Sequence, residues 1–187
     1  MKEGLNIVWL KRDLRLQDHR PFFEAEHHST CNYLPIYIME PSAMAYPDSS
    51  LRHLQFAYHS ILEMNSVLSS YNRKVHLLHG EAMDVFTFLS EQFDIQNVYS
   101  YQESGVKSTW DRDKNVSAFF KLKGIKWTEF QRDGIIRGIK NRVNWDKNWY
   151  LAVNSPLILN VYSQNEIAVK SFPFDLPEPL EKSLQNY

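Results

Sequence analysis

The chain has 187 residues, of which 43% are hydrophobic and 14% aromatic. That is enough for one substantial core and too little for two well-developed domains. The formal charge of −1 gives no overall field that would attract a phosphate backbone, so composition predicts no nucleic-acid binding. The single cysteine, Cys31, cannot form an internal disulfide. The opening apolar run, 5–10, is too short for a signal peptide or a membrane span, so we expect a cytoplasmic protein.

Short apolar runs alternate with amphipathic segments as far as residue 130. This alternation is typical of parallel strands that are buried on both faces and joined by helices. We therefore expect an α/β fold with a doubly wound, Rossmann-like, five-stranded parallel sheet of order 3-2-1-4-5 and helices on both faces. Strands are predicted at 5–10, 33–39, 74–79, 97–101 and 126–130, and helices from about 18, at 51–71, at 82–93 and at 108–123.

Single residues mark the expected ends and irregularities of these elements. Asp18 is the predicted N-cap of the first helix, and Gly124 is the predicted C-terminal stop of the last one. Pro35 removes a ladder donor, so we place it at the beginning of its strand. In the longest helix, only Asn65 breaks the apolar stripe.

The alternation of strands and helices stops after Gly134. The following residues show neither a helical nor a strand period, and the last stretch, SFPFDLPEPLEKSLQNY, is rich in proline and charge. Such a composition is typical of a linker or an unsupported tail. We therefore divide the chain into an α/β domain over 1–134 and an irregular extension over 135–187.

Ligands of open parallel sheets bind beyond the carboxyl ends of the strands, where the strand order reverses. This geometry predicts a crevice among the loops 10–18, 39–50, 79–82 and 101–108. The chain has no G-x-G-x-x-G after its first strand and no G-x-x-x-x-G-K-[ST]. The usual dinucleotide site and the P-loop phosphate site are therefore disfavoured.

The loop after the first strand, 11–15, carries three cations and one carboxylate. Its guanidinium groups suit an anionic or polar ligand. The loop can also neutralise itself if Asp13 pairs with Arg12 or Arg15. Spacing alone favours this second interpretation.

Other chemistries find less support in the sequence. No two histidines lie four residues apart with a supporting carboxylate, and Cys31 has no C-x-x-C partner, so no metal site is predicted. The sequence at 103–105 predicts a turn before a helix, and it does not match the G-x-S-x-G pattern of a nucleophile elbow. Trp145 and Trp149 lie four residues apart in a polar run and need a surface to pack on, which a partner would supply.

The stretch VWLKRDLRLQDH at 8–19 resembles the opening of the photolyase/cryptochrome family, which reads V-W-F-R-x-D-L-R-L-x-D-N. The match continues through LPIYIMEP at 34–41. Further segments are similar to a bacterial deoxyribodipyrimidine photolyase-like subgroup: YQESG at 101–105, DRD at 111–113, GIKWTE at 124–129 and GIIRG at 134–138.

The resemblance implies that, in full-length proteins, the domain packs against a helical domain that binds flavin adenine dinucleotide (FAD). Excited FAD then either repairs pyrimidine dimers in DNA or drives blue-light signalling. Damaged DNA is contacted through that helical domain only. The FAD-binding and catalytic residues belong to the helical domain, so we expect no catalytic residue in this sequence and no repair by these residues alone.

The resemblance also implies an antenna chromophore: a folate, a deazaflavin or flavin mononucleotide. Folate-binding relatives carry an Asn-Glu pair where this chain has 108–109, Ser-Thr, so flavin mononucleotide or a deazaflavin is favoured. Lysine replaces the more common arginine or glutamine at the end of the first strand, so guanidinium stacking is lost there. The expected cofactor-binding residues are Lys11, Arg12, Asp13, Glu40, Tyr101, Gln102 and Glu103.

Two other interpretations stay open at this point. The chain can be a freestanding nucleotide-binding module with the sheet topology of universal stress proteins, although that class needs a late glycine-rich phosphate loop, which the sequence lacks. It can also be an interaction module whose residues 135–187 dock a partner. If Trp145 and Trp149 bury only against a partner, the isolated chain should expose an apolar patch that a dimer would cover.

Overall fold

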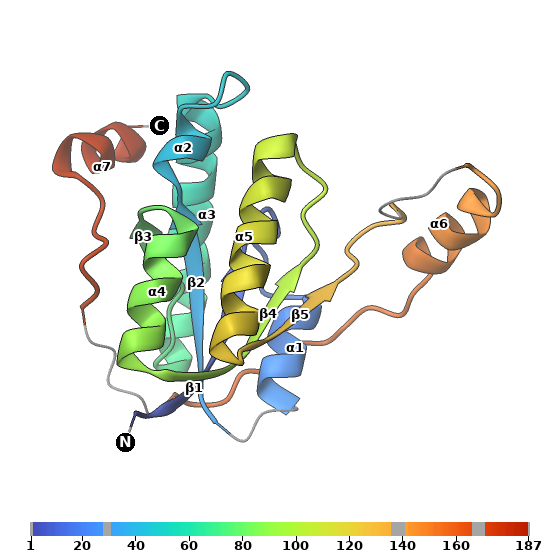
Figure 1. Ribbon diagram of the computed structural model, residues 1–187, viewed down its shortest axis with the longest axis horizontal. Coiled ribbons are helices and arrows are strands. Elements are labelled where there is room, and N and C mark those ends of the chain that lie inside the picture. The colour runs from blue at the N-terminus through green and yellow to red at the C-terminus, as the bar shows by residue number, and fades with distance from the viewer. Residues whose placement is uncertain (1, 28–30, 136–140, 166–170, 187) are drawn as a thin grey trace.

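The computed structural model describes residues 2–27, 31–135, 141–165 and 171–186 (Figure 1). Its centre is a five-stranded sheet in which every neighbouring pair of strands is parallel. The strand order is β3-β2-β1-β4-β5, which confirms the predicted fold class and order. The strands are β1 (Gly4–Leu10), β2 (Tyr33–Met39), β3 (His76–His79), β4 (Asp94–Tyr101) and β5 (Lys126–Phe130).

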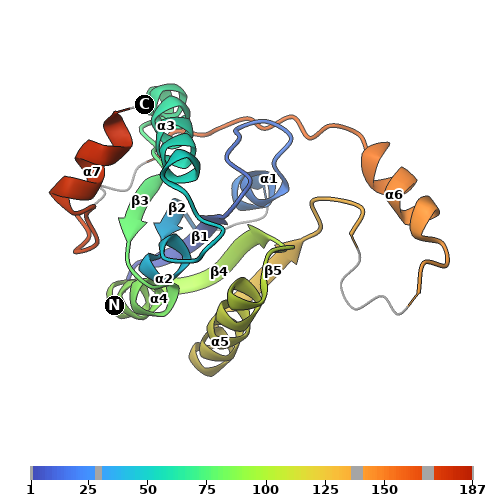
Figure 2. The same cartoon turned by 90° about the horizontal axis from the view of Figure 1, so that it is seen from above.

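Helices cover both faces of the sheet (Figure 2). One face packs against α1 (Arg20–His27) and α3 (Leu51–Leu68), and the other against α4 (Ala82–Gln92) and α5 (Lys107–Lys123). The remaining helices are α2 (Pro41–Met44), the 3₁₀ helix η1 (Ser69–Tyr71), α6 (Trp145–Val153) and α7 (Glu178–Gln185). Among the described residues, no helix is both long enough and apolar enough to cross a membrane.

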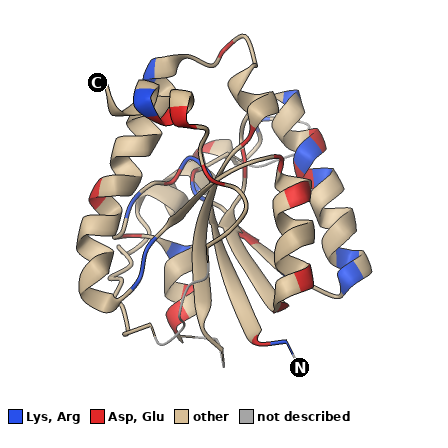
Figure 3. Ribbon diagram, turned by 90° about the vertical axis from the view of Figure 1, so that its left-hand side faces the viewer, with Lys and Arg blue, Asp and Glu red and all other residues tan. Residues whose placement is uncertain are grey.

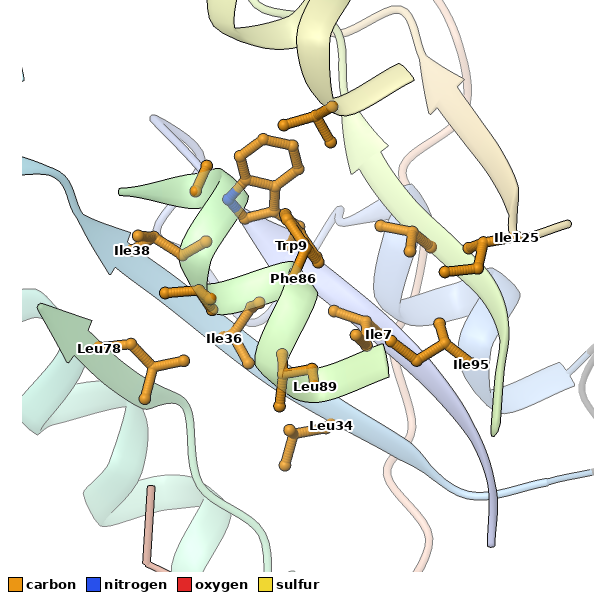
Figure 4. Close-up of a cluster of buried hydrophobic side chains, with 14 of the residues drawn as sticks. Ile7, Trp9, Leu34, Ile36, Ile38, Leu78, Phe86, Leu89, Ile95 and Ile125 are labelled. Carbon is orange, nitrogen blue, oxygen red and sulfur yellow. The ribbon is translucent and has the colours of Figure 1, made fainter. Parts of the chain in front are cut away.

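The central strand β1 is buried on both faces because alternate residues enter different cores. Ile7 and Trp9 pack among side chains from α4 (Figure 4) and from α5. Val8 and Leu10 pack among side chains from α1 and α3. Burial on both faces explains why β1 shows no polar alternation and carries Asn6 as its one polar residue. Trp9 meets Phe86 of α4 edge to face, with the ring centroids 5.0 Å apart.

Pro35 is the third residue of β2, at a place where a backbone donor is not needed. The N–H of Asn6 donates to the carbonyl oxygen of Asn32. Since hydrogen-bonding groups alternate along a parallel strand, the backbone of Pro35 faces away from β1. On that side, the first pair with β3 is Ile36 with His76. Pro35 therefore precedes the β3 ladder, in agreement with its expected place near the beginning of the strand.

The predicted N-cap of the first helix is wrong. Asp18 has a left-handed φ of 54°, whereas an N-cap residue is normally extended. His19 takes the capping role, because its ring Nδ1 accepts a hydrogen bond from the N–H of Phe22 at 3.2 Å. The Asp18 carboxylate is engaged elsewhere and accepts a hydrogen bond from the N–H of Ile158 at 3.2 Å.

Asn65, the interruption in the apolar stripe of α3, connects that helix to the residue before β3. Its side-chain amide donates to the carbonyl oxygen of Val75 at 3.1 Å and accepts from the N–H of Val75 at 2.6 Å. Both backbone groups of Val75 are therefore used by a side chain. This explains why β3 begins at His76 and not at the predicted Lys74.

We expect Asn65→Ala to lower the free energy of unfolding by about 1–2 kcal/mol, because two backbone groups of Val75 lose their partner. Ser66→Ala, at the neighbouring exposed position, is the matched control. Urea unfolding followed by circular dichroism measures the difference. Equal stability of the two variants would show that the asparagine bonds contribute nothing net.

The residues after α6 return to the domain. The segment 157–162 runs back along the loop between β1 and α1, and residues 163–165 then bond α1 and η1. Farther on, the N–H of His79 donates to the carbonyl oxygen of Phe174 at 2.7 Å, so this part of the chain bonds the last residue of the edge strand β3. α7 then packs on α3, with Leu184 completely buried. The stretch 171–186, predicted as a linker or an unsupported tail, is thus held against the domain; the division at residue 134 stays a prediction.

Candidate functional site

A cleft of about 890 Å³ opens at the carboxyl ends of β1 and β2. Its walls come from the loop after β1, the segment from β2 into α3, and the residues around the start of α5. Three of the four loops predicted to form a crevice meet there: 10–18, 39–50 and 101–108. The loop 79–82 contributes no lining residue. The cleft lies beside β1, where the strand order reverses, as expected for an open parallel sheet.

Arg112 of α5 is the centre of a buried ion-pair network. Basic and acidic residues adjoin one another along this helix (Figure 3). Its Nη1 donates to Oε1 of Glu40 at 2.6 Å, and its Nη2 donates to Oδ1 of Asp113 at 2.9 Å. Nη2 also lies 3.8 Å from Oε2 of Glu103. Burial alone would lower the pKa of Arg112, but the charges of Glu40 and Asp113 outweigh burial and raise it. The guanidinium therefore stays charged in the wall of the cleft.

Lys11 extends from the end of β1 towards the interior. Its Nζ lies 3.1 Å from Oδ2 of Asp113 and 3.8 Å from Oε1 of Glu129. The same ammonium lies over the rings of Trp9 and Trp127, 4.4 and 5.0 Å from their centroids. Burial lowers the pKa of Lys11, and the Asp113 carboxylate opposes this shift. Lys11 thus shares Asp113 with the guanidinium network.

Asp13 fixes the backbone of the same loop. Its carboxylate accepts a hydrogen bond from the N–H of Lys11 at 2.9 Å and contacts Nε2 of His19 at 2.6 Å. Because Nδ1 of His19 accepts from the N–H of Phe22, the ring proton lies on Nε2 and is donated to Asp13. Burial alone would raise the pKa of Asp13, but the hydrogen bond from His19 outweighs burial and holds this pKa below its ordinary value.

Arg12 is the exposed cation at the mouth of the cleft. Its side chain is 62% exposed, and Nε lies 3.0 Å from Oε1 of Glu103. Arg15 pairs with Asp18 at 3.2 Å. The loop therefore has its cations paired, as one interpretation of the sequence predicted, but the partners differ. Asp13 pairs with neither arginine.

Two of the expected cofactor-binding residues lie outside the cleft. The hydroxyl of Tyr101 accepts a hydrogen bond from the N–H of Arg20 at 2.9 Å, on the α1 side of the sheet. The N–H of Gln102 donates to the carbonyl oxygen of Phe130 at 2.8 Å. The other five expected residues line the cleft together: Lys11, Arg12, Asp13, Glu40 and Glu103.

Sequence reasoning missed the aromatic wall of the cleft and its central arginine. Tyr37 of β2, Tyr46 after α2 and Phe56 of α3 all line the cleft. Burial raises the pKa of Tyr37 to about 12, so its phenol remains a hydrogen-bond donor. Arg112 does lie in one of the matched segments, DRD, but no local pattern indicates that it reaches back to Glu40.

The cleft combines five lysine and arginine side chains and four carboxylates with an aromatic and aliphatic wall. Its volume is typical of a small-molecule site. The inner charges pair with one another, whereas Arg12, Arg15 and Arg132 lie at more exposed positions where an added anion can approach. The wall suits a planar ring and the mouth suits an anionic group. Within the described ranges, no three histidine, cysteine, aspartate or glutamate side chains are grouped to hold a metal ion.

The sheet and cleft define a doubly wound α/β domain with a cleft at its switch point. The family model for DNA photolyase matches residues 6–138. The chain therefore belongs to the DNA photolyase family, in which it corresponds to the N-terminal α/β domain of photolyases and cryptochromes.

Two curated relatives are cryptochromes. The chain is 23% identical over 184 residues to "Cryptochrome DASH, chloroplastic/mitochondrial" of Oryza sativa subsp. japonica, covering 90% of this chain and 30% of that protein. It is 22% identical over 121 residues to "Cryptochrome-2" of Gallus gallus, covering 65% of this chain and 20% of that protein. The chain thus spans less than a third of the length of these relatives.

Solved structures of the family share the fold. The cryptochrome of Synechocystis sp. PCC6803 superimposes with a TM-score of 0.73 at 15% identity, over 96% of this chain and 40% of that one. The archaeal photolyase from Sulfolobus tokodaii, solved with two FAD molecules, superimposes with a TM-score of 0.69 at 17% identity, over 86% of this chain and 38% of that one. A bacterial class III photolyase from Agrobacterium tumefaciens superimposes with a TM-score of 0.67 at 20% identity, over 92% of this chain and 37% of that one. Identities this low show the fold and do not assign a subgroup.

Proposed function

We propose that this chain is the antenna and docking domain of a DNA photolyase or cryptochrome. It would work with a helical FAD-binding domain, in light-driven repair of pyrimidine dimers or in blue-light signalling. The observation that carries the proposal is the switch-point cleft, with its aromatic wall and exposed arginines, in a chain that matches the family over 6–138. The segments between 101 and 138 favour the bacterial deoxyribodipyrimidine photolyase-like subgroup.

The chromophore we propose is flavin mononucleotide or a deazaflavin. Each has a planar ring on a polar chain, and the chain of flavin mononucleotide ends in a phosphate. The ring fits the wall formed by Tyr37, Tyr46 and Phe56, and the phosphate fits the exposed guanidinium of Arg12. A folate is disfavoured because the cleft residues 108–109 replace the Asn-Glu pair of folate-binding relatives.

A bound chromophore would supply light absorption and the transfer of excitation energy to FAD. The residues of this chain would bind it, orient it and keep water from its ring. Asp13 would keep the loop after β1 in place through the N–H of Lys11. Arg112 would hold the Glu40 carboxylate against the wall, so that the cleft keeps its shape when the ligand leaves.

The partner we propose for α6 is the helical FAD-binding domain. α6 projects from the body of the domain (Figure 1), and none of its residues is buried. Trp145, Trp149 and Leu151 are 44%, 41% and 71% exposed. Neighbouring exposed apolar residues of this size mark a surface for another protein. DNA would be contacted through the helical domain only, so the chain alone should repair no pyrimidine dimer under blue light.

Titration of the purified chain with flavin mononucleotide should quench the flavin fluorescence, because the ring stacks on aromatic side chains. Arg12→Ala should weaken this binding about tenfold by removing a charge-assisted contact to the phosphate. Riboflavin, which lacks the phosphate, should bind equally to the parent chain and to Arg12→Ala. Fluorescence and visible absorption measure both titrations.

Arg20→Ala is the matched control, since Arg20 is a partly exposed arginine on α1 that pairs with Glu24 outside the cleft. It should leave flavin binding unchanged. A deazaflavin and methenyltetrahydrofolate complete the set. Absence of binding for all of these chromophores would contradict the antenna proposal, and binding of adenosine triphosphate in their place would favour the freestanding nucleotide-binding module.

A further inference from the structure

The segment 157–162, by which the chain returns from α6, has the burial pattern of a strand. Leu157, Leu159 and Val161 are 84%, 74% and 63% exposed, whereas Asn160 between them is buried. Alternation with a period of two indicates an extended segment with one face on the domain. Figure 2 shows this run passing along the outer side of the β1–α1 loop.

One side of this segment's backbone is paired with that loop. The carbonyl oxygen of Ile158 accepts from the N–H of Asp18 at 2.9 Å, and the N–H of Ile158 donates to the Asp18 carboxylate. The side-chain amide of Gln17 bonds both the N–H and the carbonyl oxygen of Asn160, each at 3.0 Å. The Asn160 side chain in turn bonds both backbone groups of His19 at 2.9 Å. The segment is therefore firmly attached along its inner side.

The other side of the backbone has no such partner. Successive residues of an extended chain direct their N–H and C=O groups to opposite sides. Because the groups of Ile158 and Asn160 face the loop, those of Leu157, Leu159 and Val161 face outward. In the part of the chain that the structure describes, no residue forms a hydrogen bond with these outward groups. The segment is therefore an extended edge that carries unpaired backbone groups and an exposed apolar row.

We infer that this edge pairs with the same edge of a second copy of the chain. In an antiparallel pair centred on Leu159, the two Leu159 residues exchange both N–H···O=C bonds, and Leu157 of each copy lies opposite Val161 of the other. These are the three residues whose backbone groups face outward. Every cross-strand neighbour on the outer face is then aliphatic. One two-fold arrangement thus satisfies the backbone row and brings the two apolar rows side by side on one face.

The composition of the segment favours self-pairing. Proteins protect exposed edge strands with lysine or another charge, or with proline. The segment 157–162, LILNVY, contains none of these, and Pro156 lies just before the paired residues. A net charge of −1 also causes little repulsion between two copies. The inference is independent of the chromophore and of the helical domain.

Sedimentation of the 187-residue chain over a range of concentrations should show a reversible dimer. Leu159→Lys places two ammonium groups side by side at the two-fold axis, so it should raise the dimer dissociation constant at least about tenfold. Leu122→Lys on α5, where the leucine is 87% exposed, is the matched control and should dimerise like the parent chain. Circular dichroism shows that each variant is folded.

Two more variants test strand pairing itself. Leu159→Pro keeps an apolar side chain but removes the outward N–H, so it should weaken the dimer as well. In a Cys31→Ser background, Leu159→Cys should form a disulfide-linked dimer with oxidised glutathione as the oxidant, and Leu122→Cys should not. A chain that stays monomeric overturns the inference and leaves this edge to another partner. A dimer unaffected by both Leu159→Lys and Leu159→Pro overturns it too.

Discussion

Arg112→Met is expected to lower the free energy of unfolding by about 3–5 kcal/mol, because it leaves a buried carboxylate without its counter-charge. Glu40 is the most affected: its side chain is 6% exposed and bonds Nη1 of Arg112 at 2.6 Å. Asp113 keeps Lys11 as a partner, and Glu103 keeps Arg12. The loss therefore comes mainly from one orphaned glutamate, and urea unfolding at neutral pH measures it.

The sign of the pH dependence provides a second readout. Burial already raises the pKa of Glu40, and Arg112 opposes that shift. Without Arg112 the pKa of Glu40 rises further, so the native variant takes up a proton at a higher pH than the unfolded chain does. The destabilisation should therefore be largest at neutral pH and shrink as the pH falls. Lys107→Met, on the same helix but exposed, should leave stability nearly unchanged; equal stability of the two variants would contradict the role of the network.

The sheet was predictable because its signals are local. Both faces of β1 are buried, so the strand appears in the sequence as an apolar run that only Asn6 interrupts. Gly124 ends α5 with a φ of 71°, a conformation that glycine adopts without strain. β4 begins at Asp94, earlier than the predicted 97, because the N–H of Asp94 donates to the carbonyl oxygen of Glu3. That contact joins residues far apart in sequence, so no local pattern shows it.

The C-terminal helices were not predictable for two different reasons. α6 has no buried residue, so no core selects an apolar stripe within it. α7 is short and begins beside prolines, which makes it resemble a linker in composition. What holds α7 is tertiary: Leu184 is buried on α3, and the Gln55 side chain donates to the carbonyl oxygens of Ser183 and Asn186.

The position of the cleft was predictable, whereas its internal pairing was not. Parallel topology brings the carboxyl ends of the strands to one edge whatever the loops contain. The choice of partners depends on side chains that meet across the fold, as Lys11 meets Asp113 and Arg12 meets Glu103. Tyr101 illustrates the limit, because its place at the end of β4 was correct while its hydroxyl turns to Arg20.

The segment 157–162 and the cleft are connected through one chain of contacts. Asn160 bonds both backbone groups of His19, the His19 ring donates to Asp13, and Asp13 accepts from the N–H of Lys11. Every one of these polar groups is buried. The residues that return from α6 therefore complete the loop that forms one wall of the cleft, although they lie outside the five-stranded unit in sequence.

Acidification from pH 6.5 to about 4 is expected to cost the protein roughly 3 kcal/mol of stability through His76 alone. Burial, and after it the charge of Lys74, lowers the pKa of this histidine to about 4. No described residue hydrogen-bonds its Nε2, and its ring packs edge to face on Phe172 with centroids 5.2 Å apart. Protonation of this ring would therefore place a positive charge inside the core.

The sign follows from proton uptake. Between the unfolded pKa of 6.5 and the folded pKa of about 4, the unfolded chain binds a proton that the native chain does not. The stabilising contribution is therefore complete above pH 6.5 and is lost as the pH falls towards 4. His76→Leu removes this titration, so the difference in unfolding free energy between the parent chain and the variant should change across that window and level off below it. Parallel pH profiles for the two proteins would show that His76 is not the responsible group, and His53→Leu, on the exposed face of α3, controls for the loss of a surface histidine.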